Sequence, residues 1–175
     1  MDMDDAAFTS GEGSDVGPAG PVEEGPYDWY TRGLRLLKSG SAGAAEQLLA
    51  RAAKAEPTSR SVLEALGRAQ FEARHYARAK ATFARIIEAD PTDDYGQFAL
   101  GLSAARIGDV RTAVEHLALA TALRPGVAHY ERELKAARAR LGLPTPPAQT
   151  RTGDDAARPD FLEIPDDPMT PDDVR

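Results

Sequence analysis

Apolar and small residues recur along the chain at intervals of 34 residues. Four sets keep this interval: Gly33, Gly67 and Gly101; Ala45, Ala79 and Ala113; Leu49, Phe83 and Leu117; and Pro57, Pro91 and Pro125. Self-similarity at this period is typical of stacked helix-turn-helix units. The pattern predicts three antiparallel helix pairs, at residues 27–39 with 43–55, 60–73 with 77–89, and 94–107 with 111–123.

The repeated residue types suit the close packing of two helices. Glycine and alanine let paired helices approach, and the large apolar residue of each unit fills the space beside that contact. Proline ends the second helix because it has no backbone N–H to donate. Gly40 and Gly108 lie in the turns between paired helices, where a left-handed backbone favours glycine. Arg74 replaces them in the second unit, so we expect that turn to be the least ideal.

Three residues depart from the repeat. Arg32 occupies the slot of Leu66 and Leu100, and Gln97 replaces a large apolar residue. Gly43 weakens the start of a second helix by roughly 1 kcal/mol relative to alanine. The outer units are therefore less regular than the middle one, as terminal units of repeat arrays usually are.

One further helix is predicted after the third unit, over residues 127–141. Tyr130, Leu134, Ala137 and Leu141 form an apolar stripe along it, and Gly142 and Pro144 end it. No second helix completes a fourth unit. The segment is therefore expected to cap the exposed flank of the third unit.

The motifs resemble those of the tetratricopeptide repeat family over residues 26 to 125. The family pattern places Trp, Leu-Gly and Tyr on a first helix, Ala and a large apolar residue on a second, and a closing Pro. The first unit matches with Trp29, Gly33, Leu36, Ala45, Leu49, Ala52 and Pro57; the second with Leu63, Leu66, Gly67, Phe71, Ala79, Phe83, Ile86 and Pro91; the third with Leu100, Gly101, Ala113, Leu117, Ala120 and Pro125. The resemblance implies an all-α solenoid of three repeats plus a capping helix, in which the first helices line a concave groove.

The groove implied by this resemblance gives a set of candidate partner-binding residues: Tyr27, Tyr30, Leu34, Leu37, Glu64, Arg68, Phe71, Tyr95, Phe98 and Leu102. Each helix presents them as one stripe. The aromatic residues near the helix starts are harder to bury internally, and aromatic side chains are favoured interface anchors. The alternative is that Leu37, Phe71 and Leu102 pack between neighbouring first helices.

The ligand expected for this groove is an apolar peptide or an amphipathic helix. Some family members clamp a C-terminal carboxylate with Lys, Asn and Arg in the groove. The corresponding positions here hold Tyr30, Leu34, Ala65, Tyr95 and Ala99, none of which pairs a carboxylate as Lys or Arg would. We therefore predict a scaffold or adaptor whose partner is another protein or peptide.

Charge divides the chain into three parts. Residues 1–26 hold seven acidic and no basic residues, and residues 143–175 hold eight acidic and three basic ones. Residues 27–142 carry a net charge of +5. Both flanks are rich in Gly, Pro, Asp and Ser, and we expect them to be disordered around a repeat domain at 27–142. The acidic flanks either serve solubility or fold back weakly on the basic domain.

One apolar island interrupts the acidic C-terminal flank. It consists of Phe161, Leu162 and Ile164, within the sequence Phe-Leu-Glu-Ile-Pro. Such an island is typical of a short linear motif, and it is also compatible with a chance cluster. As a motif, it could dock on the groove of the same chain or of a neighbour.

Catalysis, metals and cofactors find no support in the sequence, so we expect neither an enzyme nor a bound cofactor. The chain has no cysteine, no Gly-rich phosphate loop and no nucleophile motif. His75, His116 and His129 have no carboxylate spaced beside them as metal ligands would, and we expect them at the solvated surface.

Location and alternative functions follow from composition. The acidic N-terminus lacks the features of a signal peptide and no apolar run approaches a membrane span, so a cytoplasmic protein is expected. Abundant Arg, Ala, Gly, Pro and Asp are typical of a high-GC bacterial genome. The alternatives are a nucleic-acid-associated protein that uses the basic repeat domain, with Arg68, Arg74, Arg78, Lys80 and Arg85 in its middle unit, and a self-associating structural protein.

Overall fold

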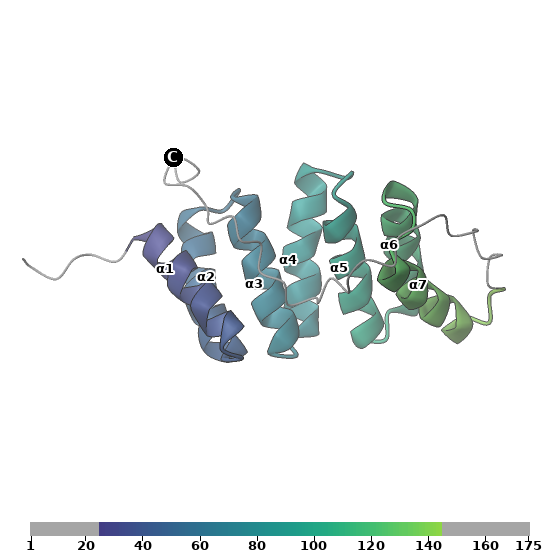
Figure 1. The fold of residues 1–175 in the computed structure, drawn as a ribbon, viewed down its shortest axis with the longest axis horizontal. Helices are drawn as coiled ribbons and strands as arrows, with labels where there is room; N and C mark the ends of the chain where they lie inside the picture. The colour runs from purple at the N-terminus through teal and green to yellow at the C-terminus, as the bar shows by residue number, and fades with distance from the viewer. Residues whose placement is uncertain (1–24, 145–175) are drawn as a thin grey trace, which may run out of the picture.

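The computed structural model describes residues 25–144, which form seven α-helices and no β-strand. The helices are α1 (Pro26–Lys38), α2 (Ala42–Ala55), α3 (Arg60–Glu72), α4 (Tyr76–Ala89), α5 (Asp94–Arg106), α6 (Val110–Leu123) and α7 (Ala128–Arg140). They stand side by side as three successive hairpins followed by α7 (Figure 1). The predicted fold class is confirmed, and each helix begins and ends within one residue of its predicted bounds.

The turns between paired helices use the left-handed backbone that the sequence predicted. Gly40 and Gly108 have φ angles of 78° and 85°. Arg74 takes the same conformation in the second hairpin, with φ 63°, and it is the only residue other than glycine with a positive φ between residues 25 and 144. A Cβ atom makes this conformation costly. The second turn is therefore the strained one, as expected.

Helix starts are fixed by local hydrogen bonds. The Asp93 side chain accepts from the Gly96 backbone N–H at 2.8 Å and caps α5. Asp109 caps α6 in the same way, accepting from the Thr112 N–H at 3.3 Å. These bonds satisfy backbone donors that have no partner inside the helix.

The glycines of the repeat lie where the two helices of each hairpin touch. A Cβ atom at Gly33 would lie 2.6 Å from Leu49 Cγ, one at Gly67 2.7 Å from Phe83 Cζ, and one at Gly101 2.8 Å from Leu117 Cγ. All three distances are shorter than van der Waals contact, so a side chain at any of these positions would force its neighbour to shift. The side chains opposite the glycines are completely buried. The predicted pairing of glycine with a large apolar residue is thus confirmed in every repeat.

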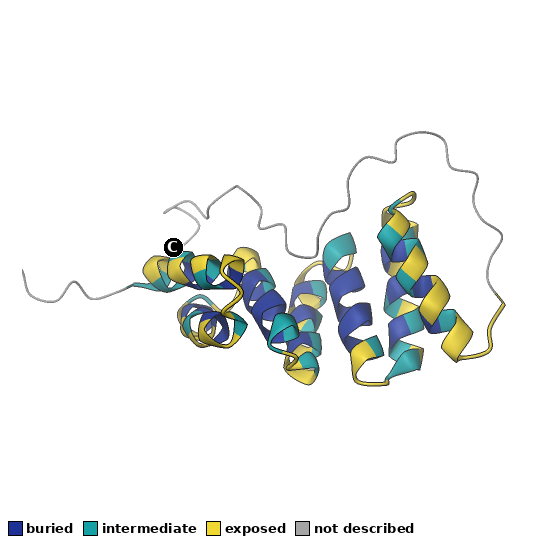
Figure 2. Cartoon of the chain, turned by 60° about the horizontal axis from the view of Figure 1, so that its bottom comes forward, coloured by how far each residue is buried: buried dark blue, intermediate teal, exposed yellow. Residues whose placement is uncertain are grey.

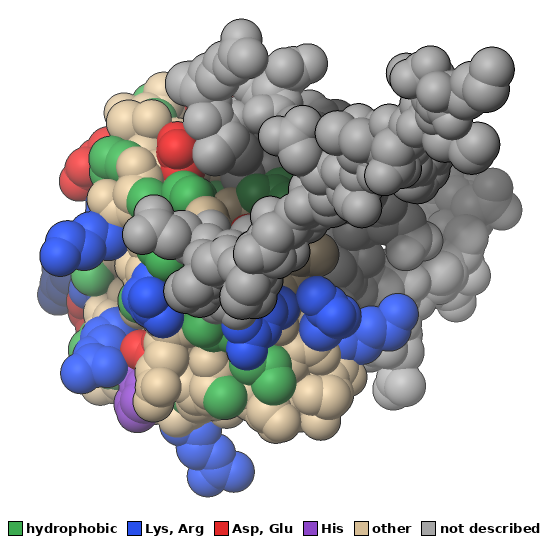
Figure 3. Space-filling view, turned by 90° about the vertical axis from the view of Figure 1, so that its left-hand side faces the viewer, with side chains coloured by type: hydrophobic (Ala, Val, Ile, Leu, Met, Phe, Trp, Pro, Cys, Tyr) green, Lys and Arg blue, Asp and Glu red, His purple; other side chains and the backbone are tan. Residues whose placement is uncertain are grey.

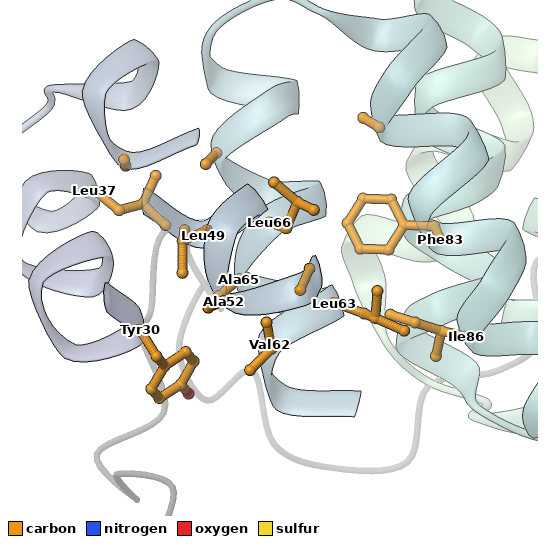
Figure 4. Packing of buried hydrophobic residues seen from close by; sticks show 14 of the residues in the cluster. Tyr30, Leu37, Leu49, Ala52, Val62, Leu63, Ala65, Leu66, Phe83 and Ile86 are labelled. Atoms are coloured by element: carbon orange, nitrogen blue, oxygen red, sulfur yellow. The ribbon is translucent and has the colours of Figure 1, made fainter. Parts of the chain in front are cut away.

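The core runs along the array between the two helix layers. Its centre combines the small residues Ala45, Ala79 and Ala113 with the large ones opposite the glycines. Figure 4 shows Phe83 pointing from α4 toward α3, where Leu66 faces it. Burial is most continuous on α3 and α5, whose residues 65–70 and 96–104 are all buried, whereas the helices at the two ends are more exposed (Figure 2).

Helix α7 covers the third hairpin, as predicted. Tyr130, Leu134 and Ala137 are buried against α6 and α5. Leu141 was expected to extend this stripe, but it lies just beyond the helix and is 41% exposed. The apolar stripe therefore ends one turn earlier than the sequence indicated.

The predicted domain boundaries remain predictions. The helical array spans residues 26–140, which agrees with a repeat domain at 27–142. The flanks predicted to be disordered are represented only by their ends, because residues 1–24 and 145–175 lie outside the described part of the chain.

Candidate functional site

The first helices of the hairpins form the inner layer of the array. Helix α1 contacts α3, and α5 contacts α7, whereas each second helix makes its main contacts with first helices. In a curved stack, the layer whose members lie closest together is on the inside. We call the side of α1, α3, α5 and α7 that faces away from the second helices the inner face.

Half of the predicted partner-binding residues are buried in the described chain. They are Tyr30, Leu37, Arg68, Phe98 and Leu102. The expectation that Tyr30 and Phe98 resist burial because they lie near helix starts was therefore wrong. Packing between neighbouring first helices, the alternative considered for Leu37 and Leu102, agrees with their burial.

Phe98 is buried by the capping helix. Its ring stacks on the Tyr130 ring with centroids 4.4 Å apart and an interplanar angle of 17°. The His129 ring meets it edge-on at 4.9 Å. The sequence placed Tyr130 on the buried side of the capping helix but did not indicate that α7 reaches across to Phe98. Phe98 thus joins α5 to α7.

The other five predicted residues keep accessible surface. Tyr27 is exposed, and Leu34, Glu64, Phe71 and Tyr95 are partly buried. Phe71 meets Tyr76 edge-on at 5.1 Å, and the Arg106 guanidinium lies 5.8 Å from its ring centroid. Tyr95 packs edge-on against Phe83 at 6.2 Å. Partly accessible aromatic side chains therefore lie on both α3 and α5, and each packs against an aromatic residue of α4.

A group of charged side chains lies among these aromatics on α3. Burial raises the pKa of the Glu64 and Glu72 carboxyl groups, and the nearby Arg68 guanidinium opposes this shift. Burial also raises the pKa of the Tyr95 hydroxyl. The Glu72 Oε1 atom is buried and has no hydrogen-bond partner among residues 25–144. The inner face thus offers an acceptor between apolar surfaces.

Ion pairs at the helix starts connect successive repeats. Arg60 Nε lies 2.6 Å from Asp93 Oδ2, and Arg60 Nη1 lies 3.0 Å from Glu64 Oε2. In the next repeat, the Tyr130 hydroxyl donates to Asp94 Oδ2 at 2.9 Å. Asp93 thus both caps α5 and pairs with Arg60, whereas its neighbour Asp94 binds the capping helix.

A second set of inter-repeat ion pairs lies where each turn meets the preceding second helix. Glu46 contacts His75 Nδ1 at 2.6 Å and Arg78 Nη1 at 3.1 Å. One repeat later, Lys80 Nζ lies 2.6 Å from Asp109 Oδ2 and holds the pKa of that carboxyl down at about 2. Sequence analysis missed these pairs, although Glu46–His75 and Lys80–Asp109 both join residues 29 apart.

His75 is exposed, as expected, whereas His116 and His129 are partly buried. His75 contacts the Glu46 carboxylate, and His116 Nδ1 lies 2.7 Å from Gln97 Oε1. Burial lowers the pKa of both His116 and His129. Within residues 25–144, no group of three or more His, Asp or Glu side chains is placed to hold a metal ion.

None of the described helices has the length and apolar character needed to cross a membrane. The predicted motif at Phe161, Leu162 and Ile164 lies outside the described residues.

Comparisons with known proteins agree on one fold. A family model described as tetratricopeptide repeat matches residues 36–101, and no curated protein matches the chain. Among solved structures, "MamA MSR-1 C2" is 22% identical with a TM-score of 0.63 and 68% of each chain covered. MamA 41-end from Desulfovibrio magneticus RS-1 is 20% identical with a TM-score of 0.64 and 67% of each chain covered.

A third similar structure is the first tetratricopeptide repeat domain of Spaghetti (RPAP3) bound to the HSP90 peptide SRMEEVD. It is 14% identical, with a TM-score of 0.63, 67% of this chain covered and 93% of that one. At these identities the likeness shows the fold. With the triple glycine contact and the family match, it shows that residues 25–144 have the tetratricopeptide repeat fold, an architecture that presents extended surfaces for protein partners.

Proposed function

We propose that the chain is a non-catalytic cytoplasmic scaffold that binds an apolar peptide or an amphipathic helix on its inner face. The observation that carries this proposal is the partly buried apolar surface of Leu34, Phe71 and Tyr95 on three successive first helices. Side chains already held by neighbours lose little conformational entropy when a partner binds. Aromatic groups in such positions are common interface anchors.

The positions of a carboxylate clamp support an apolar ligand. Tyr30, Leu34, Ala65, Tyr95 and Ala99 offer no cationic donor, and both alanines are buried. The RPAP3 domain is described with an acidic HSP90 peptide. Its likeness to this chain is in fold, and we do not expect this chain to bind peptides of that kind.

The nucleic-acid alternative loses support because four of the five cations named for the middle repeat are engaged or buried within the protein. Arg78 pairs with Glu46, and Lys80 pairs with Asp109. Arg85 donates to the Pro57 carbonyl oxygen at 2.6 Å, and Arg68 is buried. Affinity for nucleic acid depends on free cations that neutralise phosphates.

Selection from a displayed library of random peptides on the immobilised full chain tests the proposal. We expect the selected peptides to be apolar, and the affinity of a labelled one, measured by fluorescence anisotropy, to fall at least about tenfold in the double variant Leu34→Ser with Phe71→Ser. The matched control removes two exposed leucines from α6, Leu119→Ser with Leu123→Ser. Equal losses in both variants, or selected peptides defined by a C-terminal carboxylate, would refute the proposal.

A further inference from the structure

We infer that the inner face between α3 and α5 is a docking site for the apolar island of the chain's own C-terminal segment, Phe161, Leu162 and Ile164. This inference rests on the proposed function, because it assigns an occupant to the same surface. A tail bound there would compete with an external partner. The chain would then carry its own inhibitor of binding.

The surface offers apolar contact that suits a short island. Phe71 on α3 and Tyr95 on α5 are partly buried; Phe71 meets the Tyr76 ring and the Arg106 guanidinium, and Tyr95 meets the Phe83 ring. Leu34 on α1 is a partly buried aliphatic residue that packs against the same core cluster. The island offers three apolar side chains within four residues for contact with these aromatic side chains.

Charge favours the same occupant. Residues 25–144 contain 18 basic and 13 acidic residues, a net charge of +5, whereas residues 145–175 contain eight acidic and three basic ones, a net charge of −5. Lys and Arg side chains lie around the α1 end of the array with hydrophobic side chains between them (Figure 3). Opposite net charges on the two parts raise the rate at which the tail encounters the array.

The acceptor on α3 suits a segment that brings donors. Glu72 Oε1 is buried, and no group in the described part of the chain donates a hydrogen bond to it. A peptide bound beside Phe71 supplies backbone N–H groups, and Arg158 precedes the island by three residues. A hydrogen bond to a buried carboxylate is among the stronger ones.

The connecting segment is long enough. The described chain ends at Pro144, and 17 residue steps separate it from Phe161, which extends to at most roughly 60 Å. Neighbouring helices lie about 10 Å apart, so α3 is roughly 20 Å from α7 across the inner layer. A flexible tether of this length gives an effective concentration in the millimolar range.

The test compares the full chain with a tail variant, Phe161→Ser with Leu162→Ser and Ile164→Ser. The control removes apolar residues elsewhere in the same segment, Met169→Ser with Val174→Ser. The probe is a fluorescent peptide of residues 157–168, titrated into each protein and followed by anisotropy. With an effective concentration of about 1 mM and an intrinsic Kd of about 0.1 mM, we expect the wild type and the control to bind the probe about tenfold more weakly than the tail variant.

Hydrogen exchange of the same proteins provides a second readout. In the tail variant, amides in residues 60–72 and 94–106 should exchange faster than in the wild type and the control, at an unchanged melting temperature. Equal probe affinity and equal exchange in all three proteins would overturn the inference. Competition that grows with protein concentration would also overturn it, because the occupant would then be the tail of a second copy.

Failure of this inference is distinguishable from failure of the proposed function. If the probe does not bind the tail variant but a displayed apolar peptide does, and that peptide is lost with Leu34→Ser and Phe71→Ser, the tail is not the occupant and the proposed function stands. If neither peptide depends on the inner face, both proposals fall.

Discussion

Replacing Gly67 with alanine tests the central packing contact of the fold. Gly67 lies on α3 opposite the ring of Phe83 on α4. An added Cβ would lie 2.7 Å from Phe83 Cζ and 2.9 Å from each of Cε1 and Cε2. Phe83 is completely buried, so the ring has no free space into which it can retreat. The two helices must therefore move apart, or the ring must leave its rotamer.

The expected change in the free energy of unfolding combines a loss from overpacking with a gain in helix propensity. Overpacking of a buried contact costs about 1–3 kcal/mol. Alanine in place of glycine inside a helix gains about 0.8–1 kcal/mol. The contact involves three ring atoms and no flexible chain end, so we expect the cost near the upper end of its range and a net loss of about 1–2 kcal/mol. For a domain of this size, the melting temperature should fall by about 3–8 °C.

Gly43 provides the matched control. It lies in α2, and a Cβ atom there meets nothing within 4 Å. Gly43→Ala should therefore stabilise the protein, by up to about 1 kcal/mol. Urea unfolding followed by circular dichroism measures both variants, and the double variant Gly67→Ala with Phe83→Leu should recover part of the loss. If Gly67→Ala were as stabilising as Gly43→Ala, the assignment of the helix contact to this glycine would be refuted.

Three further variants probe the turn, the capping helix and the inter-repeat ion pair. Arg74→Gly should stabilise the protein by about 1 kcal/mol in the same urea assay, because glycine removes the cost of a left-handed backbone. Phe98→Ala should cost about 3–5 kcal/mol and speed amide exchange in α7, because it removes a buried ring stacked on Tyr130. Asp109→Asn keeps the helix cap but loses the pairing with Lys80. Because that pairing lowers the pKa of Asp109 to about 2, its stabilisation is present above pH 4 and lost toward pH 2, so the melting temperatures of wild type and Asp109→Asn should converge over that interval.

The sequence was sufficient to predict the fold because one constraint is repeated three times. Glycine, alanine, a large apolar residue and proline at fixed offsets determine which helices pair and where each one ends. Arg74 was informative for the same reason, since it occupies a glycine position and the structure gives it a positive φ. Repetition makes a single-sequence interpretation robust, because an accidental match in one repeat is not reproduced in the next.

Side-chain environments on the first helices could not be predicted as well. The register of one helix shows which residues share a stripe, but burial depends on how closely the next helix approaches. Phe98 was expected on open surface, yet the ring of Tyr130 on α7 covers it. Arg68 was expected to line a groove, yet it is buried. These outcomes depend on spacing between repeats, which local periodicity does not encode.

The inter-repeat ion pairs explain how nearly identical repeats keep their order. Each hairpin presents a similar apolar flank, so hydrophobic packing alone would also accept the first repeat directly against the third. The arrangement of charge is reversed between the two junctions. At the first junction the second helix presents an acidic residue, Glu46, to His75 and Arg78. At the second junction the second helix presents a basic residue, Lys80, to Asp109. Skipping the middle repeat would place Glu46 against Asp109, two carboxylates in contact. Each pair has at least one partner that keeps substantial contact with solvent, which limits its contribution to stability. Selectivity depends instead on the difference between the correct and the wrong partner, and like charges penalise the wrong one. The charges at these junctions thus specify the order of repeats that the core residues leave undetermined.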